Sequence, residues 1–273
     1  MLSNARSLLF VPGNRPERFA KAGASGADVA CIDLEDAVPP PDRVAARTAV
    51  IAFLRAQPSG HHYGVRISRL AAADGLRDAL TLHEAQAAPA FVMLAKTESA
   101  EQLVLLSQWL PNTPLIALIE SARGLAAASA IASANAPLHA LMFGGADFAA
   151  ELGAELAWEP MLHARSTLAA AAASANLACL DVPWLDVADA AGAEAETRHV
   201  AALGFTGKAL IHPSQVAPVH AGLMPSAEAL ARARRVVAAS GENDAAVLVD
   251  GRLVDRPVVL AAQRTLRRAG ELN

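Results

Sequence analysis

Short, almost continuously apolar runs alternate with longer segments of helical periodicity along most of the chain. Runs of this kind, without alternation of polar and apolar positions, are typical of parallel strands that helices cover on the outside. We expect eight strands, within residues 7–13, 27–36, 61–68, 90–97, 114–121, 139–147, 177–183 and 204–213. Eight strand–helix units with short connections predict an α/β protein with a closed (β/α)8 barrel, the TIM barrel. The alternative is a doubly wound open sheet, and the nearly even spacing of the strands argues against it.

The pattern changes after His212. An amphipathic helix is expected over residues 226–241, and a last helix over residues 258–270. Between them, short apolar segments flank the pair Asp250 and Gly251, and this combination predicts a β-hairpin. We therefore expect a TIM barrel domain over residues 1–212. Residues 213–273 are expected to form a helical and hairpin extension that packs on the barrel or on a neighbouring subunit.

Length and composition agree with one large barrel. The chain has 273 residues, of which 53% are hydrophobic, and its net charge is −4. A mildly acidic protein has no general attraction to nucleic acid or anionic membranes, so local arginines and lysines must bind any anionic ligand. Cys31 and Cys179 lie within apolar runs and are expected to be buried free thiols, as in a reducing compartment. Because no stretch resembles a signal peptide or a membrane span, the sequence predicts a cytoplasmic protein.

Charged or titratable side chains recur where the expected strands end. They are Asp33, Glu35, Asp36, Arg66, Lys96, Glu120, Asp147, Asp181, Lys208 and His212. A single residue of this kind often only closes a strand, but the active sites of barrels lie at the carboxyl ends of their strands. The whole set therefore predicts an active site at this end of the barrel.

Two of these residues predict a metal site. Glu120 and Asp147 follow neighbouring strands, and oxygen ligands without histidine or cysteine favour Mg²⁺ over Zn²⁺. The alternative is structural, because each carboxylate could instead cap a helix. Gly144 and Gly145, just before Asp147, favour the metal, because glycines let the backbone approach a ligand closely.

Arg66 and Lys96 supply positive charge near the acidic residues. The planar fork of Arg66 suits a carboxylate or an enolate, and it could also pair with Glu35 and Asp36. Lys96 could form a Schiff base with a carbonyl substrate. With two metal carboxylates available, we instead expect Lys96 to hold Glu35 in place.

The end of the first expected strand offers an anion site. A glycine turn there precedes a helical segment whose free backbone N–H groups could bind an anion. The turn and the basic residues that follow it are Pro12, Gly13, Asn14, Arg15, Arg18 and Lys21. The alternative is an ordinary solvated first helix.

Several ordered motifs resemble those of one family. The sequence is similar to the HpcH/HpaI aldolase and citrate lyase β-subunit family, and within it to CitE-like acyl-CoA lyases, in "RSLLFVPGN", "IDLEDAV", "GVRIS", "KTES", "GGADF" and "GFTGKALIHPSQV". The likeness extends from Arg6 to about Val216, and the tail "DGRLVDRPVVLAA" is also similar. It implies a Mg²⁺-dependent TIM barrel that assembles as a homotrimer or hexamer.

The resemblance also implies roles for individual residues. Glu120 and Asp147 would match the Mg²⁺ ligands. Glu35 and Asp36 would match acidic residues that support the metal's water molecules and the substrate. Arg66 would match the arginine that holds a 2-oxo acid. The "FVPG" turn and the basic residues after it would match part of the coenzyme A site.

The activity that the resemblance implies is cleavage of a carbon–carbon bond in a 3-hydroxyacyl-CoA with a carboxylate beside its hydroxyl. Citramalyl-, citryl- or malyl-CoA would give acetyl-CoA and, respectively, pyruvate, oxaloacetate or glyoxylate. Asp255 would match the tail aspartate that reaches a neighbouring subunit's site, where it would protonate the enolate carbon. Locally, Asp255 could instead cap the last helix.

Three alternative functions are open. One is a class II pyruvate aldolase that acts on free hydroxy-oxo acids, and another is a citrate lyase β subunit that acts on a citryl thioester linked to a carrier protein. The third is a barrel that binds metabolites without catalysis.

The chain also departs from the family at Ser68, where asparagine is common, and at Asn176, where glycine is common. Because asparagine tolerates a left-handed backbone, we expect the turn at Asn176 to survive.

Overall fold

The computed structural model describes residues 2–58, 60–240 and 246–272. The chain divides into two compact units, Met1–His220 and Ala221–Asn273. The boundary between them falls inside helix α10 (Val216–Leu223).

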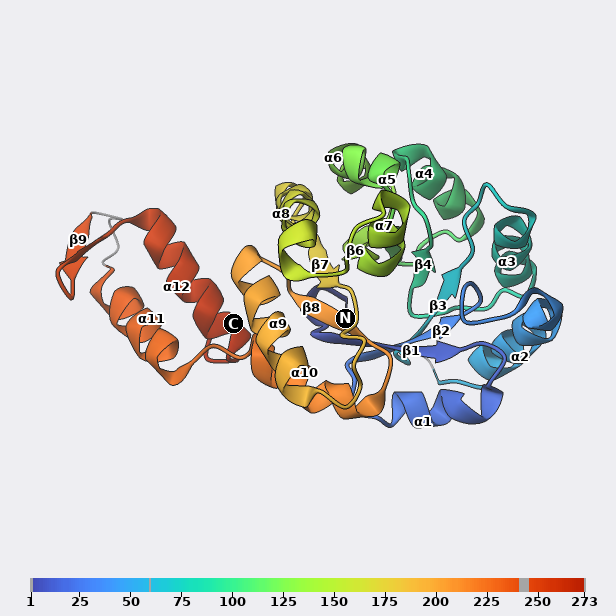
Figure 1. Ribbon diagram of the computed structural model, residues 1–273, viewed down its shortest axis with the longest axis horizontal. Helices are drawn as coiled ribbons and strands as arrows, with labels where there is room; N and C mark the ends of the chain where they lie inside the picture. Colours follow the sequence, from blue (N-terminus) through green and yellow to red (C-terminus); the bar gives the residue numbers. More distant parts are fainter. Residues whose placement is uncertain (1, 59, 241–245, 273) are drawn as a thin grey trace. The chain divides into compact units, whose positions relative to one another are not determined.

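Eight parallel strands form a closed barrel in the first unit, in the order of the sequence (Figure 1). They are β1 (Ser7–Pro12), β2 (Val29–Asp33), β3 (Tyr63–Ile67), β4 (Val92–Leu94), β5 (Leu115–Ile119), β6 (Leu138–Phe143), β7 (Ala178–Asp181) and β8 (Gly207–Leu210). Parallel pairing of β1 with β8 closes the barrel. The prediction of a TIM barrel is therefore confirmed, and the alternative of an open sheet is wrong.

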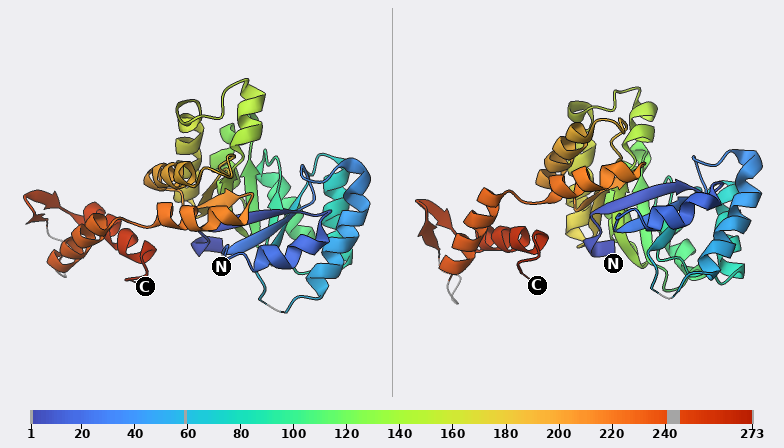
Figure 2. Two further views of the ribbon diagram at one scale, coloured as in Figure 1. Left: turned by 60° about the horizontal axis from the view of Figure 1, so that its bottom comes forward. Right: turned by 90° about the horizontal axis from the view of Figure 1, so that it is seen from below.

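Helices surround the strands of this unit, as the two views in Figure 2 show. They are α1 (Phe19–Gly23), α2 (Arg43–Arg55), α3 (Ala73–Glu84), α4 (Ala100–Trp109), α5 (Ala122–Ala126), α6 (Ala128–Ala132), α7 (Gly145–Leu152), α8 (Trp158–Ser174) and α9 (Ala190–Leu203). Short 3-10 helices are η1 (Leu2–Asn4), η2 (Pro16–Arg18), η3 (Pro40–Asp42) and η4 (Pro213–Gln215). Asn176, between α8 and β7, has a φ of 56°, so the left-handed turn expected there is confirmed.

Apolar side chains from alternate strand positions share one buried cluster. Because successive residues of a strand point to opposite faces, alternate residues meet inside the barrel. Members of the cluster include Leu8, Val29, Cys31, Met93, Ile116, Leu118, Ala140 and Met142. Cys31 and Cys179 are free and buried, as predicted, and burial raises the pKa of both thiols. Neither cysteine is therefore suited to act as a nucleophile.

The second unit combines two helices with a hairpin. Its elements are α11 (Ala227–Ala239), β9 (Val247–Val249), β10 (Arg252–Val254) and α12 (Arg256–Arg268). Strands β9 and β10 pair antiparallel, and Asp250 and Gly251 both have positive φ, as a tight hairpin turn requires. The predicted hairpin is therefore confirmed. Among the described residues of the whole chain, no helix is long and apolar enough to span a membrane.

Candidate active site

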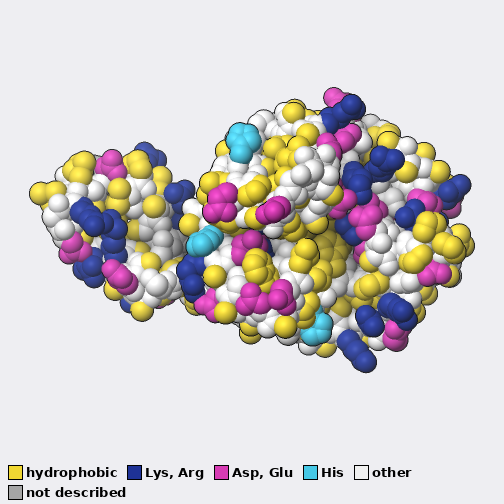
Figure 3. All heavy atoms as spheres, in the orientation of Figure 1, with side chains coloured by type: hydrophobic (Ala, Val, Ile, Leu, Met, Phe, Trp, Pro, Cys, Tyr) yellow, Lys and Arg dark blue, Asp and Glu magenta, His cyan; other side chains and the backbone are white. Residues whose placement is uncertain are grey.

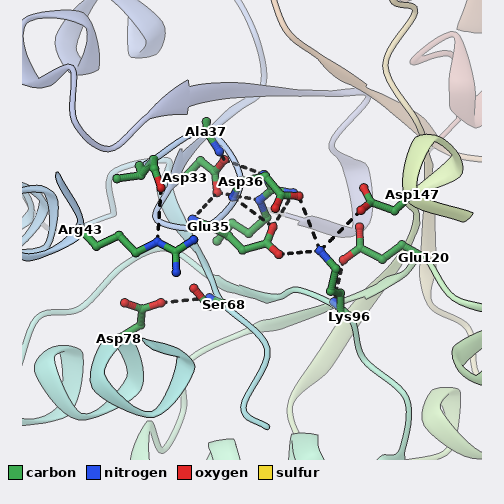
Figure 4. Close-up of polar contacts among 12 residues, drawn as sticks. Asp33, Glu35, Asp36, Ala37, Arg43, Ser68, Asp78, Lys96, Glu120 and Asp147 are labelled. Atoms are coloured by element: carbon green, nitrogen blue, oxygen red, sulfur yellow. Dashed lines mark hydrogen bonds and ion pairs between the residues drawn. The ribbon is translucent and has the colours of Figure 1, made fainter. Parts of the chain in front are cut away.

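Four carboxylates and one lysine come together beyond the carboxyl ends of the strands. Lys96, which follows β4, directs its ammonium group toward Glu35, Asp36 and Asp147 (Figure 4). Its Nζ lies 2.9 Å from Oε1 of Glu35, 3.5 Å from Oδ1 of Asp147 and 3.7 Å from Oδ2 of Asp36. Its backbone N–H donates to Oε1 of Glu120 at 2.7 Å. The structure thus brings these five residues of the expected site together.

Lys96 has an unusual backbone conformation, with a φ of 50°. A left-handed backbone is unfavourable for a residue with a side chain, so surrounding contacts must hold it. Burial alone would lower the pKa of Lys96, but the hydrogen bond and charge of Glu35, together with the charges of Glu120 and Asp36, raise it. An ammonium group held in this way is not a nucleophile at neutral pH. The geometry therefore fits the role of holding Glu35 and not that of a Schiff base.

Glu120 is almost fully buried next to other carboxylates. Burial, and then the charges of Glu35 and Asp147, raise its pKa to about 8, although Arg66 and Lys96 oppose this shift. A cation between the carboxylates would remove their mutual repulsion. Gly144 also belongs to this arrangement, because a Cβ there would lie 2.7 Å from Oε2 of Glu120. Only glycine lets the strand end pass this close to the carboxylate.

This set of oxygen ligands fits Mg²⁺. The pair expected to bind the metal is Glu120, which directly follows β5, and Asp147, in the first turn of α7. Within the described part of the chain, no group of three or more histidine, cysteine, aspartate or glutamate side chains has a metal-binding arrangement. Mg²⁺ commonly uses only one or two carboxylates and completes its shell with water and substrate oxygens. Two protein ligands are therefore sufficient for this ion.

Arg66 is held by an aspartate to which the sequence alone assigned no role. Its Nε and Nη2 donate to the two carboxylate oxygens of Asp33 at 2.7 and 2.6 Å, and its Nη1 lies 3.3 Å from Oε2 of Glu35. Asp33 also accepts the backbone N–H groups of Glu35 and Ala37, so each of its oxygens receives two hydrogen bonds. Burial would lower the pKa of Arg66, but these carboxylates outweigh it and raise the pKa. The guanidinium is fixed and charged, and its Nη1–Nη2 edge is not used by Asp33.

The turn after β1 keeps its shape through backbone contacts. The N–H of Gly13 donates to the carbonyl of Asp33 at 2.8 Å, and a Cβ on Gly13 would lie 2.6 Å from that oxygen. Asn14 donates to Asp42. The expected helix after Pro12 is only a 3-10 turn followed by the five-residue α1. An anion site here would therefore depend on the exposed side chains of Arg15, Arg18 and Lys21 more than on a helix N-terminus.

Three of the strand-end residues, Asp181, Lys208 and His212, make their contacts outside this group of five. Asp181 and Lys208 are fully buried and pair with each other at 2.6 Å. Arg165 and Glu196 complete this separate network, which neutralises charges between the last barrel strands and their helices. His212 accepts the backbone N–H of Ser214 at the start of η4.

Asp255 lies in the second unit, at the N-cap of α12. Its side chain accepts the backbone N–H of Val258 at 3.4 Å. The helix-capping contact that the sequence offers as an alternative is therefore present. A role in another subunit's site stays a prediction.

A cavity of about 260 Å³ adjoins the carboxylates of the site. Its lining is Arg69, Ala71, Lys96, Glu98, Gln102, Glu120, Ser121, Asp147 and Glu151. Figure 3 shows acidic and basic side chains side by side on the face of this unit that it presents. No pattern in the sequence identifies Arg69, although it stands three residues after Arg66. The loop that turns it toward the cavity follows no simple pattern.

Known proteins match this chain over nearly its whole length. The chain is 42% identical to a "Citrate lyase subunit beta-like protein" of Mycobacterium tuberculosis, over 96% of this chain and 95% of that protein. It is 30% identical to the mitochondrial citramalyl-CoA lyase of Homo sapiens, over 97% of this chain and 85% of that protein. A crystal structure of CitE from Mycobacterium tuberculosis in complex with magnesium, acetoacetate and coenzyme A superposes with a TM-score of 0.87. That structure is 41% identical, and the match covers 99% of this chain and all of that one.

The family model described as HpcH/HpaI aldolase/citrate lyase matches residues 6–213, which include the entire barrel. The chain therefore belongs to the HpcH/HpaI aldolase/citrate lyase family.

Proposed function

We propose that this protein is a Mg²⁺-dependent carbon–carbon lyase that cleaves a 3-hydroxyacyl-CoA carrying a carboxylate beside its hydroxyl. The products would be acetyl-CoA and a 2-oxo acid. The observation that carries this proposal is the meeting of Glu120 and Asp147 with Glu35, Asp36 and Lys96 beside a cavity at the strand ends. Relatives named as lyases of this substrate class, and a CitE structure that holds magnesium and coenzyme A, support it.

Glu120 and Asp147 would hold the metal, and Glu35 and Asp36 would accept hydrogen bonds from its water molecules. Bound there, Mg²⁺ would act as a Lewis acid and favour the deprotonated form of the substrate's hydroxyl group. Lys96 keeps Glu35 in place through its 2.9 Å hydrogen bond and faces Asp147.

Arg66 would bind the carboxylate or developing oxygen charge through the guanidinium edge that Asp33 does not use. The hydroxyl group would lose its proton to solvent, and cleavage of the carbon–carbon bond would then leave a 2-oxo acid and the enolate of acetyl-CoA, whose carbon must gain a proton. Asp255 of a neighbouring subunit would donate it, and would remove the same proton in the condensing direction. Coenzyme A would lie against the turn at Pro12, Gly13 and Asn14 and the basic side chains of Arg15, Arg18 and Lys21. The role of Asp255 in a neighbouring subunit's site requires a homo-oligomer, which we propose to be a trimer or hexamer.

Incubation of the pure protein with citramalyl-, citryl- and malyl-CoA, with and without Mg²⁺, tests the proposal directly. Mg²⁺-dependent release of acetyl-CoA from at least one thioester is expected. Cleavage only of a carrier-protein-linked citryl thioester would instead favour a citrate lyase β subunit. Cleavage only of free hydroxy-oxo acids would favour a class II pyruvate aldolase.

Replacing Arg66 with lysine is expected to lower kcat/KM by about 10²-fold, because an ammonium group cannot bind a carboxylate through two parallel hydrogen bonds. The measurements are steady-state kinetics and the Kd of the 2-oxo acid. Arg123→Lys, at an exposed arginine outside the cavity lining, is the matched control and should behave as wild type. Near-normal affinity of Arg66→Lys for the 2-oxo acid would show that the guanidinium does not clamp it.

The affinity for Mg²⁺ should rise with pH, up to about pH 8. In the metal-free protein the pKa of Glu120 is raised from 4.5 to about 8. The protonated carboxyl of Glu120 therefore contributes fully to the free energy of unfolding below pH 4.5, and this contribution is lost as the pH rises through 8. Mg²⁺ must displace this proton, so affinity is expected to increase by about tenfold per pH unit well below pH 8 and then level off. Calorimetric titrations in buffers of different ionisation enthalpy measure the proton released. A wild-type affinity that is constant between pH 6 and pH 8, or equal proton release from Glu120→Gln, would contradict this assignment.

A further inference from the structure

The cavity beside the metal carboxylates has no lining residue from the turn expected to bind coenzyme A. Its lining comes from the loops after β3, β4 and β5, the first turn of α4, and α7. The coenzyme A turn follows β1, which lies four strands from β5 in the closed barrel. A substrate with its thioester near β1 and its hydroxyl carbon at the metal would therefore direct its remaining substituent into this cavity.

Two cations line the cavity, and their surroundings differ. Lys96 is hydrogen-bonded to Glu35. Arg69 is exposed, and within the described part of the chain it forms no ion pair or side-chain hydrogen bond. Its loop is nevertheless well fixed, because the backbone N–H of the preceding Ser68 donates to the buried Asp78 at 3.0 Å (Figure 4). Arg47 in turn holds Asp78 at 2.6 Å. The guanidinium thus extends from a fixed loop with its hydrogen-bond donors available.

Gln102 adds a second donor to the same cavity. Its Oε1 accepts the backbone N–H groups of Glu98 at 2.8 Å and Ser99 at 3.2 Å, so the orientation of the amide is fixed. Its Nε2 has no hydrogen bond to another residue in the described ranges, and as a lining residue it can donate to a ligand. A guanidinium and an amide nitrogen form a pair of donors for an oxygen anion.

The carboxylates of the lining do not cancel this preference. Glu98 accepts the hydroxyl of Ser121 at 2.8 Å, and Glu151 accepts the backbone N–H of Ala122 at 3.1 Å. The other two, Glu120 and Asp147, are the proposed metal ligands. A divalent ion would offset the charges of Glu120 and Asp147. An anion that enters would then meet Arg69, the lining cation that forms no ion pair within the described part of the chain.

We infer that Arg69, with Gln102, binds a second carboxylate on the 2-oxo acid part of the substrate. This inference depends on the proposed lyase function and specifies its substrate class. The preferred thioester carries a carboxymethyl group on its hydroxyl carbon, so the 2-oxo acid released is a dicarboxylate such as oxaloacetate. Pyruvate and glyoxylate leave Arg69 and Gln102 without a ligand.

The test compares two 2-oxo acids that differ in one group. Oxaloacetate has a carboxylate where 2-oxobutanoate has a smaller, uncharged methyl group. Binding of each, freshly prepared, to the Mg²⁺-loaded protein is measured by calorimetry for wild type, Arg69→Gln, Arg69→Lys and Arg77→Gln. Arg77 is the matched control, because it is an exposed arginine on α3 whose contact is a 3.4 Å ion pair with Asp74.

Arg69→Gln is expected to weaken oxaloacetate binding about tenfold, as for the loss of one charged hydrogen bond, and to leave 2-oxobutanoate binding unchanged. Arg69→Lys should lie between wild type and Arg69→Gln, and Arg77→Gln should match wild type. Equal losses for both acids, or no loss for oxaloacetate, would overturn the role of Arg69. A wild-type protein that cleaves an acyl-CoA with Mg²⁺ but binds 2-oxobutanoate more tightly would overturn this inference alone. A wild-type protein without Mg²⁺-dependent binding or cleavage would overturn the proposed function as well.

Discussion

Glu120→Gln is expected to lower kcat by about 10²–10³-fold and to weaken Mg²⁺ binding strongly, because it removes one of only two proposed protein ligands. The fold should survive this change. Glutamine has nearly the same shape, and its Oε1 can still accept the backbone N–H of Lys96. Above pH 8 the metal-free variant should be more stable than metal-free wild type, because wild type must then bury an ionised carboxylate whose pKa is raised to about 8. Kinetics, calorimetric Mg²⁺ titration and thermal unfolding at two pH values measure these effects.

Asp147→Asn should give a similar loss of Mg²⁺ binding and activity. Its matched control is Glu155→Gln, an exposed carboxylate shortly after the same helix and outside the cavity lining. The control separates loss of a ligand from a general loss of negative charge near the site. If either Glu120→Gln or Asp147→Asn kept wild-type Mg²⁺ affinity and turnover, that residue would not be a metal ligand.

The fold was predictable because its strongest signals are local. Apolar runs with a strand's length, separated by helical periodicity, identify eight strand–helix units without any knowledge of contacts. The turn at Asp250 and Gly251 and the left-handed Asn176 were predictable for the same reason, since each depends on the conformational range of one or two residues. The position of the second unit's Asp255 relative to any site depends on assembly, which no local pattern encodes.

The site was predictable only in part. Strand-end position selects Lys96, Glu120 and Asp147, and the structure brings them together, because in a barrel all strands end on the same rim. Their roles stay predictions. The same rule also selects Asp181 and Lys208, which pair with each other instead. Strand-end position alone does not say whether a charged side chain faces the rim or a charge on the next strand.

The Asp33–Arg66 pair was missed for a related reason. These residues are register partners in the β2–β3 ladder, and the sequence of neither strand alone determines the register between them. Arg69 was missed because an irregular loop, held by Asp78, determines its direction.

Asp255→Asn is expected to reduce turnover by about 10²–10⁴-fold with little change in thermal stability. Asparagine is nearly as good an N-cap as aspartate, so the contact to the backbone N–H of Val258 can persist while the acid–base group is lost. Asp255→Ala separates the two roles further, because it should also lower stability by about 0.5–2 kcal/mol through loss of the cap. A fully active Asp255→Asn enzyme would leave only the capping role.

Mixing of two impaired variants tests whether Asp255 acts in another subunit. If one subunit supplies Arg66 and its neighbour supplies Asp255, an oligomer that contains both Asp255→Asn and Arg66→Lys subunits has some interfaces with both intact residues. Activity should then rise above that of either variant after subunit exchange, while each variant incubated with itself keeps its low activity. If both residues act within one chain, every site in the mixture lacks one of them, so no activity is regained. Exchange verified by mass spectrometry without recovery of turnover would therefore exclude a shared site and would place the proton donor in the same subunit or on another residue.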